Sequence, residues 1–310
     1  MKVTSYGLSK KVSSELASRL GIAYSAVQQP LAPECADAET EAAIITVYSR
    51  ITAETLDRMP RLKAVIWAST GIDEAGAAEC RQRGIEVRNC PTYATNAVAE
   101  LAIALALAAL RDIPSMVEAG KDLRYPSGFA FGSELRGKRC SILGAGRIGS
   151  QIARTLIALG CTVTAYSRTR KQELVDAGVR YAGLGDALAS ELIFIALPDT
   201  EATYHLIGDK ELGLLKDGSG IINISRGEVI DSTALLAHIG RLAFVVTDVL
   251  EGQFPTHPAD KATLKAVAEL LKKPNFLHTP FVGVCTDEAG ERLIRELLAV
   301  LAGLGLGKTF

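Results

Sequence analysis

Several features that would place this 310-residue chain in a special class of protein are missing from its sequence. Its 34 Lys and Arg residues nearly balance its 35 Asp and Glu residues, so the net charge of −1 indicates no basic surface for nucleic acid or for an anionic membrane. The longest apolar run, residues 97–110, is too short to span a bilayer and contains Glu100. The first ten residues lack the apolar core of a signal peptide. We therefore expect a cytoplasmic protein with neither a membrane nor a nucleic-acid partner.

Cysteine is present, but it follows no recognisable pattern. The six cysteines are scattered without C-x-x-C spacing, which disfavours a metal site and suggests small core residues in a reducing compartment. They are Cys35, Cys80, Cys90, Cys140, Cys161 and Cys285. The sequence also lacks internal repeats and low-complexity segments. We expect an ordinary globular chain without a metal.

The clearest motif that is present lies in residues 138–171, which read strand, glycine turn, helix, strand. Residues 144–149, GAGRIG, fit the pattern G-x-G-x-x-G directly after a short apolar strand. In this pattern the first glycine permits a tight turn, the second lets a pyrophosphate approach, and the third lets helix and strand pack closely. The N–H groups that begin the helix then form an anion site. The motif predicts dinucleotide binding by Gly144, Gly146, Arg147, Ile148 and Gly149.

The strand that follows, residues 162–166, ends where such folds distinguish NAD from NADP. An NAD site has an Asp or Glu about 20 residues past the glycines, and this chain has Ser167, Arg168 and Thr169, followed by two further cations. No carboxylate is present to repel a 2′-phosphate, and each close cation–phosphate contact is worth up to roughly 4 kcal/mol before desolvation. A solvated basic turn is the alternative interpretation. We predict NADP (NADPH) as the cofactor, with NAD less favoured.

The length of the chain suggests two domains. Residues 1–95 alternate strands and helices, and two of their strand-end loops, residues 47–50 and 68–73, are candidates for ligand contact. The small-residue turn in the second loop offers backbone N–H groups to an anion such as a carboxylate, although an ordinary strand-to-helix turn before Asp73 is equally compatible. The candidate substrate-binding residues are Tyr48, Arg50, Ser69, Thr70 and Gly71.

The rest of the chain predicts a doubly wound parallel sheet. Residues 97–111 predict a helix, and residues 112–137 predict a loop or arm. Four later strands end in polar or glycine-rich loops, which is typical of a sheet that gathers a ligand site at its carboxyl edge. These strands are residues 191–197, 220–224, 243–249 and 275–277. The amphipathic final helix, residues 287–304, is expected to return to the first domain.

Taken together, these loops resemble the D-specific 2-hydroxyacid dehydrogenase family, and the resemblance covers nearly the whole chain. The segments that carry it are STGID at 69–73, NAVAE at 96–100, the glycine turn, LP to Thr203 at 197–203, NISRGEVID at 223–231 and TDV at 247–249. The resemblance implies an α/β fold in which a Rossmann-type nucleotide domain (96–281) is inserted in a smaller, flavodoxin-like substrate domain (1–95 plus 282–310). It also implies a homodimer, and hydride transfer between a nicotinamide and a 2-keto or 2-hydroxy acid.

The resemblance also implies roles for individual residues. Arg226 corresponds to the arginine that grips the substrate carboxylate and carbonyl, a task that suits a bidentate guanidinium. Asp248 corresponds to the residue that binds the nicotinamide carboxamide, and residues 69–71 correspond to a carboxylate-binding loop. The other cofactor contacts implied are Leu197, Pro198, Thr203, Ile224, Ser225 and Gly283.

Two catalytic positions depart from the family pattern. Where the family has a Glu this chain has Gln253, and where it has a proton-donating His this chain has Phe281. Formate dehydrogenases of the same family use Gln at the first position, but a phenyl ring has no proton to give. The four histidines, His205, His238, His257 and His278, are expected to be structural or on the surface, and the alternative is that His257 or His278 reaches the site.

The leading hypothesis is an NADP-dependent oxidoreductase that reduces a small 2-keto acid such as glyoxylate or hydroxypyruvate, with Arg226, Gln253 and Phe281 at the catalytic positions. One alternative is hydride transfer that requires no general acid. Another is an NADP(H)-binding protein of the same fold with little or no turnover. The intact Arg226 favours an enzyme, because a pure nucleotide binder has less need of it.

Overall fold

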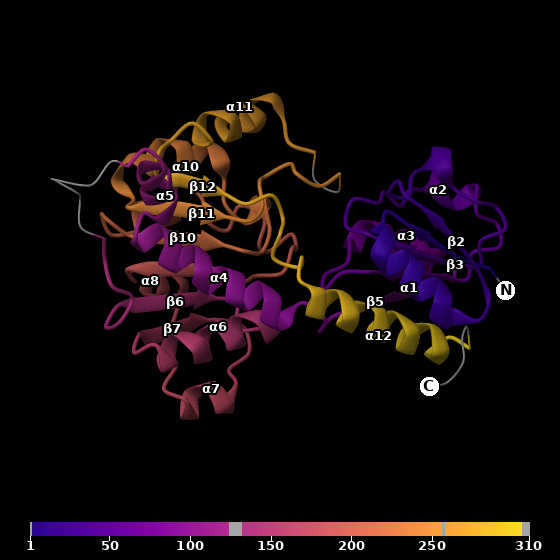
Figure 1. The fold of residues 1–310 in the computed structure, drawn as a ribbon. Helices are drawn as coiled ribbons and strands as arrows, with labels where there is room; N and C mark the ends of the chain where they lie inside the picture. Colours follow the sequence, from indigo (N-terminus) through magenta and orange to yellow (C-terminus); the bar gives the residue numbers. More distant parts are fainter. Residues whose placement is uncertain (1, 124–131, 256–257, 306–310) are drawn as a thin grey trace. The chain divides into compact units, whose positions relative to one another are not determined.

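The computed structural model describes residues 2–123, 132–255 and 258–305, which form two compact units (Figure 1). Unit 1 comprises Met1–Ala94, Phe254–Pro258 and Val284–Phe310, and unit 2 comprises Thr95–Gln253 and Ala259–Gly283. The main difference from the boundaries expected from the sequence is the short segment at 254–258, which groups with unit 1. The ring of Phe254 lies 5.3 Å from the ring of Tyr48, and this contact ties the segment to unit 1.

Unit 1 is built on five parallel strands in the order β2-β1-β3-β4-β5, which is the 2-1-3-4-5 order of flavodoxin-like sheets. The strands are β1 (Lys2–Tyr6), β2 (Ala23–Val27), β3 (Ala42–Ile45), β4 (Ala64–Trp67) and β5 (Glu86–Asn89). The helices are α1 (Lys10–Leu20), α2 (Ala53–Asp57), α3 (Glu74–Gln82) and α12 (Asp287–Gly303). The C-terminal helix α12 packs beside α1, so the end of the chain returns to the first unit as the sequence predicts (Figure 1).

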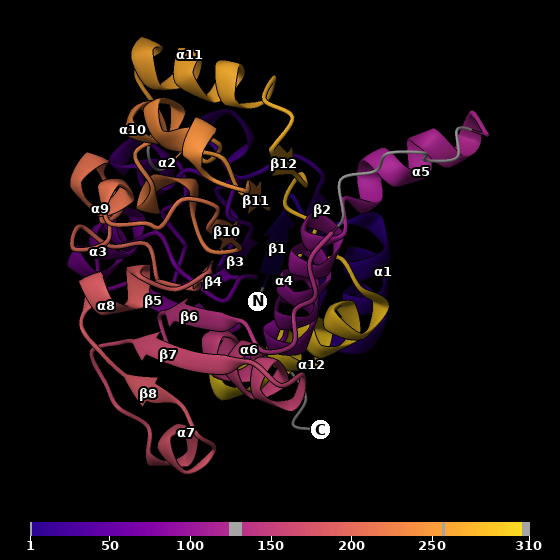
Figure 2. The same ribbon diagram turned by 90° about the vertical axis from the view of Figure 1, so that its left-hand side faces the viewer.

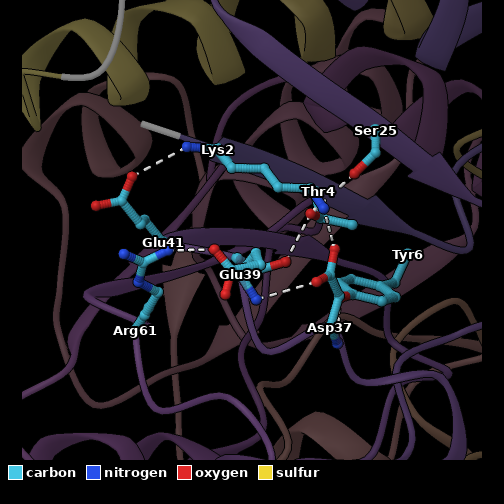
Figure 3. Close-up of polar contacts among 9 residues, drawn as sticks. Lys2, Thr4, Tyr6, Ser25, Asp37, Glu39, Glu41 and Arg61 are labelled. Atoms are coloured by element: carbon cyan, nitrogen blue, oxygen red, sulfur yellow. Dashed lines mark hydrogen bonds and ion pairs between the residues drawn. The ribbon is translucent and has the colours of Figure 1, made fainter.

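A network of polar side chains surrounds the first half of β1 (Figure 3). The buried hydroxyl of Thr4 lies 2.6 Å from that of Thr40 and 3.0 Å from that of Ser25, and Lys2 forms an ion pair with Asp37. The backbone N–H of Asp37 donates to the hydroxyl of Tyr6, whose pKa is raised by burial. These contacts begin at the amino end of β1, at the sheet edge opposite the strand-end loops, and they fasten the start of the chain to β2 and to the segment before β3.

Unit 2 contains seven parallel strands in the order β12-β11-β10-β9-β6-β7-β8. Counted from β8, the first six strands have the order 3-2-1-4-5-6 of the Rossmann fold, in which β6 is strand 1 and β9 is strand 4. The order reverses between β6 and β9, which is the topological switch point. The strands are β6 (Arg139–Leu143), β7 (Thr162–Tyr166), β8 (Arg180–Tyr181), β9 (Leu192–Ile195), β10 (Gly220–Asn223), β11 (Phe244–Thr247) and β12 (Phe276–His278). Four of them are buried along their whole length or nearly so, namely β6, β9, β10 and β11, as expected of a parallel sheet covered on both faces.

Unit 2 includes a helix that the sequence did not predict. The helices of this unit are α4 (Thr95–Leu110), α5 (Ile113–Lys121), α6 (Arg147–Ala158), α7 (Gln172–Asp176), α8 (Leu184–Leu188), α9 (Asp209–Gly213), α10 (Ser232–His238) and α11 (Lys261–Leu270). Helix α5 occupies part of the segment predicted as a loop or arm. Its Pro114 lies in the first turn, where proline is compatible with a helix, so the proline does not mark a loop here.

Candidate functional site: the carboxyl edges of the two sheets

The glycine turn joins β6 to α6, and steric constraints explain two of its three glycines. Gly144 has a φ of +99°, and a Cβ added there would lie 2.5 Å from the carbonyl oxygen of Ala196. A Cβ on Gly149 would lie 1.9 Å from the carbonyl oxygen of Gly144. These two positions exclude any side chain because backbone atoms occupy the space.

Gly146 differs from its two neighbours in the motif. A Cβ added to it would meet nothing within 4 Å, and it begins α6 without any side-chain cap. Gly146 and Arg147 are exposed, and Ile148 is half-buried above the packed face of the helix. Open space beside uncapped N–H groups at a helix start is what a pyrophosphate requires. The turn therefore fits the pyrophosphate of a dinucleotide, with Gly146, Arg147 and Ile148 as the residues that would hold it.

The basic segment after β7 divides into two parts. Ser167 is half-buried while Arg168 and Thr169 are exposed, and within the described ranges none of the three side chains has a hydrogen-bond or ion-pair partner. Arg170 instead lies over the ring of Tyr181, 5.5 Å from its centroid. Lys171 turns back toward the glycine turn. Of the predicted 2′-phosphate contacts, Ser167, Arg168 and Thr169 are thus available, whereas the two further cations, Arg170 and Lys171, are engaged within the protein.

Lys171 is a residue whose position the sequence did not indicate. Its Nζ donates to the carbonyl oxygen of Gly146 at 3.2 Å and to the hydroxyl of Ser150 at 2.9 Å. Its backbone N–H donates to the hydroxyl of Tyr181 at 3.1 Å. The ammonium group therefore adds a positive charge beside the start of α6, where an anionic cofactor would be bound.

The loop after β9 contains three of the predicted cofactor contacts. Leu197 packs against the buried core of unit 2, and the hydroxyl of Thr203 donates to the carbonyl oxygen of Pro198 at 2.7 Å. The same hydroxyl accepts from the N–H of Thr200 at 2.9 Å. Thr203 therefore fixes the shape of the turn, and the turn as a whole is what would meet a cofactor.

Arg226 follows β10 on a loop that is fixed by Asn223. The side chain of Asn223 donates to the carbonyl oxygen of Arg226 at 2.8 Å and accepts from both the N–H and the hydroxyl of Ser225. Ile224 and Ser225 are buried, and Arg226 is half-buried with its Nη1 donating to the carbonyl oxygen of Ser225 at 2.8 Å. Asn223 was not among the predicted site residues. Asn223 is the last residue of the strand, and a polar residue at that position is the sequence feature that could have indicated its role.

The loops after β10 and β11 are in close contact. A Cβ on Gly227 would lie 2.1 Å from the backbone nitrogen of Glu251, so only glycine fits beside Arg226. Oε1 of Glu228 accepts from the N–H of Gly252 at 3.1 Å. These contacts give the Arg226 loop a single supported position relative to the next loop of the sheet edge.

Asp248, at the end of β11, is buried with 4% of its surface exposed. Its Oδ1 accepts from the hydroxyl of Thr279 at 2.6 Å and from the N–H of Val282 at 2.9 Å. Its Oδ2 accepts from the N–H of Gly283 at 2.9 Å. A carboxylate has about four acceptor positions, so most of the capacity of Asp248 is used to hold the segment 279–283. We refer to Asp248 and these three donors as the Asp248 clamp.

Phe281 lies within the segment held by the Asp248 clamp. Its φ of +58° is in the left-handed region, which is a genuine outlier for a bulky residue, and its N–H donates to the carbonyl oxygen of Asp248 at 3.0 Å. Gln253, at the other departing position, uses its side-chain oxygen to accept from the N–H of Leu250 at 2.9 Å. The amide of Gln253 thus closes its own turn.

Three of the four histidines lie in unit 2 and have protein partners. Nε2 of His205 is 2.6 Å from Oε1 of Glu251, and Nε2 of His238 is 2.8 Å from Oδ1 of Asp209. Nδ1 of His278 is 3.1 Å from the carbonyl oxygen of Thr247. His257 lies outside the described residues.

The His205–Glu251 pair joins loops that are distant in sequence. Glu251 is 5% exposed and its Oε2 accepts from the N–H of Ser232 at 3.0 Å, while the N–H of His205 donates to the carbonyl oxygen of Glu228. The ring of Tyr204 stacks on that of His205 at 4.1 Å, and burial, followed by the charge of Glu251, raises the pKa of Tyr204. Sequence spacing gave no indication of this pair, because His205 and Glu251 are 46 residues apart.

In unit 1 the predicted substrate residues lie at the ends of β3 and β4. The hydroxyl of Ser69 donates to the carbonyl oxygen of Gly71 at 2.5 Å, and the carbonyl oxygen of Thr70 accepts from the side chain of Asn89 at 2.8 Å. Tyr48, which is 41% exposed, and Arg50, which is also exposed, lie in the loop after β3. The carboxylate of Asp73 caps α3, so the 69–71 turn is a strand-to-helix turn of fixed shape, and this is compatible with both interpretations that the sequence left open.

The cysteines and the metal-ligating residues add no chemistry to these edges. Burial raises the pKa of Cys80 to about 11 and that of Cys90 to about 12, so both are inert thiols. Within residues 2–123, 132–255 and 258–305, no three His, Cys, Asp or Glu side chains are grouped to hold a metal. In the same ranges, none of the helices has the length and apolar character needed to cross a membrane.

Comparison with known proteins identifies the family. Residues 103–283, more than half of the chain, match the model described as D-isomer specific 2-hydroxyacid dehydrogenase, NAD binding domain. A glyoxylate reductase from Thermococcus litoralis is 35% identical over 272 residues, which cover 84% of this chain and 79% of that protein. A hydroxypyruvate reductase from Thermotoga maritima is 31% identical over 264 residues, covering 84% and 83%. A D-lactate dehydrogenase from Aquifex aeolicus, solved with NAD and lactic acid, has a TM-score of 0.87 at 26% identity, covering 98% and 95%. The chain therefore belongs to the D-isomer specific 2-hydroxyacid dehydrogenases, oxidoreductases that use a nicotinamide cofactor.

Proposed function

We propose that this protein is an NADPH-dependent reductase of a small 2-keto acid such as glyoxylate or hydroxypyruvate. The observation that carries the proposal is the supported position of Arg226, at the same carboxyl edge of the seven-stranded sheet as the glycine turn. Ligands bind at this edge in doubly wound sheets. The names of the relatives from Thermococcus litoralis and Thermotoga maritima support glyoxylate and hydroxypyruvate as the first substrates to test.

In this proposal the nicotinamide supplies the hydride, and the residues of the chain bind and orient. Arg226 grips the carboxylate and polarises the carbonyl, since a guanidinium presents donors in a fixed fork. The glycine turn holds the pyrophosphate, assisted by Leu197, Pro198, Ile224, Ser225 and Gly283 on the neighbouring loops. Asp248 orients the nicotinamide carboxamide through its remaining acceptor capacity, and the 69–71 turn and the Tyr48–Arg50 loop of unit 1 contact the substrate.

Arg226 is tested by its replacement with alanine and, as the matched variant, with lysine. We expect Arg226→Ala to bind NADPH as the parent does but to lose affinity for oxalate and turnover of glyoxylate by about 10- to 100-fold, as a charged hydrogen-bonding partner is worth about 1.5–3 kcal/mol. Arg226→Lys retains the charge without the fork and should recover only part of the loss. An Arg226→Ala variant that binds oxalate as well as the parent would show that the residue is only structural.

The cofactor preference rests on Ser167, Arg168 and Thr169, whose side chains are available at the end of β7. NADPH should bind more tightly than NADH in calorimetric titration, and Ser167→Asp with Arg168→Ala should reverse the order, because the new carboxylate repels the 2′-phosphate. Arg170→Ala is the matched control. It removes a nearby cation that is engaged with Tyr181, so it should leave the preference unchanged. Equal affinities for the two cofactors in the parent would refute the assignment.

The second candidate function is an NADP(H)-binding protein with little turnover, and Phe281 together with Gln253 favours it. The variant Gln253→Glu with Phe281→His separates the candidates. Glutamate can still accept from the N–H of Leu250, and histidine is among the residues that tolerate a left-handed backbone, so neither change disturbs its turn. We expect the double variant to raise glyoxylate reduction by about 10²–10⁴-fold, the usual contribution of a general acid. No turnover by the parent and none by the double variant would favour the binding protein.

We also propose that the chain forms a homodimer through unit 2. Helix α5 extends away from the sheet of unit 2 (Figure 2), and none of its residues is buried although Ile113 and Val117 are apolar. Val117 is 51% exposed. Covering these side chains with a second copy would remove the apolar surface from water. Light scattering after gel filtration should give twice the monomer mass, and Ile113→Ser with Val117→Ser should shift it toward the monomer, whereas a monomeric parent would refute the proposal.

The proposed location is the cytoplasm. All six cysteines are free thiols in the structure, which suits a reducing compartment. When the full-length protein is denatured without a reducing agent and treated with a thiol reagent, six cysteines should be labelled.

A further inference from the structure

The carboxyl edge of the seven-stranded sheet offers a strong positive group but commits its acids elsewhere. Arg226 is held there by Asn223, while His278 is bonded to Thr247, and His205 is bonded to Glu251. The two carboxylate oxygens of Asp248 together accept from three donors, so this side chain is committed to holding the segment 279–283. At this edge the position of the family's proton-donating His holds Phe281, while His205 and Nδ1 of His278 are bonded within the protein.

The same edge holds the backbone of an aromatic residue in a strained conformation. A left-handed backbone costs a non-glycine residue roughly 1–2 kcal/mol, yet the Asp248 clamp holds Phe281 in that conformation by bonds on both sides of it. Strain that the surrounding structure over-determines in this way is a feature of ligand-binding positions. Phe281 therefore has a fixed place at the edge that also carries Arg226.

An arginine, an aromatic residue with a fixed backbone and a buried carboxylate at one sheet edge suit a substrate that is an anion at one end and a cation at the other. The guanidinium matches a carboxylate, and the face of an aromatic ring attracts a cation. The carboxylate of Asp248 adds negative potential on the Phe281 side of the loop, since the backbone N–H of Phe281 donates to the carbonyl oxygen of the same residue. A neutral carbonyl gains nothing from the ring or from this potential.

We propose that this protein reduces the protonated imines of small 2-keto acids, the species that form when a 2-keto acid condenses with ammonia or a primary amine and loses water. The inference rests on the nicotinamide site and on the role of Arg226 in the proposed function. It adds a further activity, reductive amination to a 2-amino acid, and assigns Phe281 as the residue that selects the cationic carbon–nitrogen double bond.

The chemistry of this reduction balances without a protein acid. Hydride adds to the imine carbon, the π-electron pair of the C=N bond becomes the lone pair on nitrogen, and the nicotinamide is oxidised by two electrons. The nitrogen already carries its proton, so no proton has to arrive in the transition state, and the amine takes up a further proton from water after it leaves. A ketone requires a proton on oxygen as the hydride arrives, and Phe281, at the position of the family's proton-donating His, cannot give one.

The test measures NADPH oxidation by the full-length protein with glyoxylate fixed and methylamine increased, at a mildly alkaline pH where part of the amine is neutral and condensation proceeds. Mass spectrometry then distinguishes N-methylglycine, the imine product, from glycolate, the keto-acid product. We expect the rate to rise with methylamine and N-methylglycine to exceed glycolate at least about tenfold, since a missing general acid alone is worth 10²–10⁴-fold. Arg226→Ala should abolish both products.

Two variants assign the selectivity to Phe281. Phe281→Leu retains an apolar side chain without a π-face and should lower the ratio of N-methylglycine to glycolate by about 2- to 30-fold, the range of a cation–π contact. Gln253→Glu with Phe281→His adds an acid and should shift the product toward glycolate. The melting temperature of each variant, measured alongside, separates these effects from loss of folding.

The outcomes distinguish this inference from the proposed function. Oxidation of NADPH that is independent of methylamine and yields only glycolate would overturn the inference and leave the keto-acid reductase intact. Oxidation that requires methylamine would support the inference and overturn keto-acid reduction as the main activity. NADPH binding without oxidation in either condition would overturn both.

Discussion

Two single-methyl substitutions in the glycine turn should give opposite results although they are three residues apart. Gly149→Ala places a Cβ 1.9 Å from the carbonyl oxygen of Gly144, where only a backbone shift can relieve the contact. Overpacking typically costs about 1–3 kcal/mol, and a clash with backbone belongs at the upper end of that range. Alanine recovers up to about 1 kcal/mol of helix propensity. We expect a net loss of about 2 kcal/mol, which corresponds to a melting temperature lower by roughly 4–8 °C for a unit of this size.

Gly146→Ala adds the same methyl group where nothing lies within 4 Å, at a φ of −68° that alanine adopts freely. The free energy of unfolding without cofactor should therefore change by no more than about 0.5 kcal/mol, because the loss at the helix start and the gain in the unfolded state nearly cancel. The methyl group does occupy the space proposed for the pyrophosphate. The loss of one charge-assisted hydrogen bond, about 1.5–3 kcal/mol, should weaken NADPH binding by about 10- to 100-fold.

Calorimetry checks both halves of this prediction, as a thermal scan without cofactor and as a titration with NADPH. The reasoning would be refuted by a Gly146→Ala variant that melts as early as Gly149→Ala. It would equally be refuted by a Gly146→Ala variant that binds NADPH as tightly as the parent, since the open space would then not be the cofactor site.

Three further predictions concern single residues. Asp248→Asn should lower the free energy of unfolding by about 1–3 kcal/mol in a urea titration, because an amide cannot accept from all three donors of the clamp. An unchanged urea concentration at the midpoint of unfolding would show that the clamp is dispensable. Phe281→Gly should be more stable than Phe281→Ala by about 1–2 kcal/mol in the same titration, because only glycine adopts the left-handed backbone without cost, and the reverse order would contradict the strain. The pKa of Asp37 is lowered from 3.8, chiefly by the hydrogen bond from Lys2, so its contribution to stability is present above about pH 4 and is lost as the pH falls through the folded-state pKa. Asp37→Asn should therefore make the free energy of unfolding fall less steeply as the pH is lowered. An unchanged pH dependence would show that the ion pair contributes nothing.

The sequence alone determined the class of fold and the place of the cofactor turn. The G-x-G-x-x-G spacing could be interpreted because its causes are local, namely a tight turn at Gly144 and close packing at Gly149, and the structure shows both contacts. The alternation of strands and helices likewise predicted two doubly wound units, because parallel strands need crossovers and a right-handed crossover leaves few topologies.

Only the tertiary structure decided which side chains work together at the sheet edge. Asp248, predicted as a cofactor contact, also holds the segment around Phe281, and Gln253 closes its own turn. His205 and Glu251 meet although they are 46 residues apart, because their loops follow β9 and β11, which flank β10 and end at the same edge of the sheet. Such pairings depend on the distances between loops, which a chain does not encode in any local spacing. Helix propensity is a local property, but residues 113–121 predict a loop only if Pro114 is taken to end a helix. In the structure Pro114 lies in the first turn of α5, where a proline is compatible with the helix.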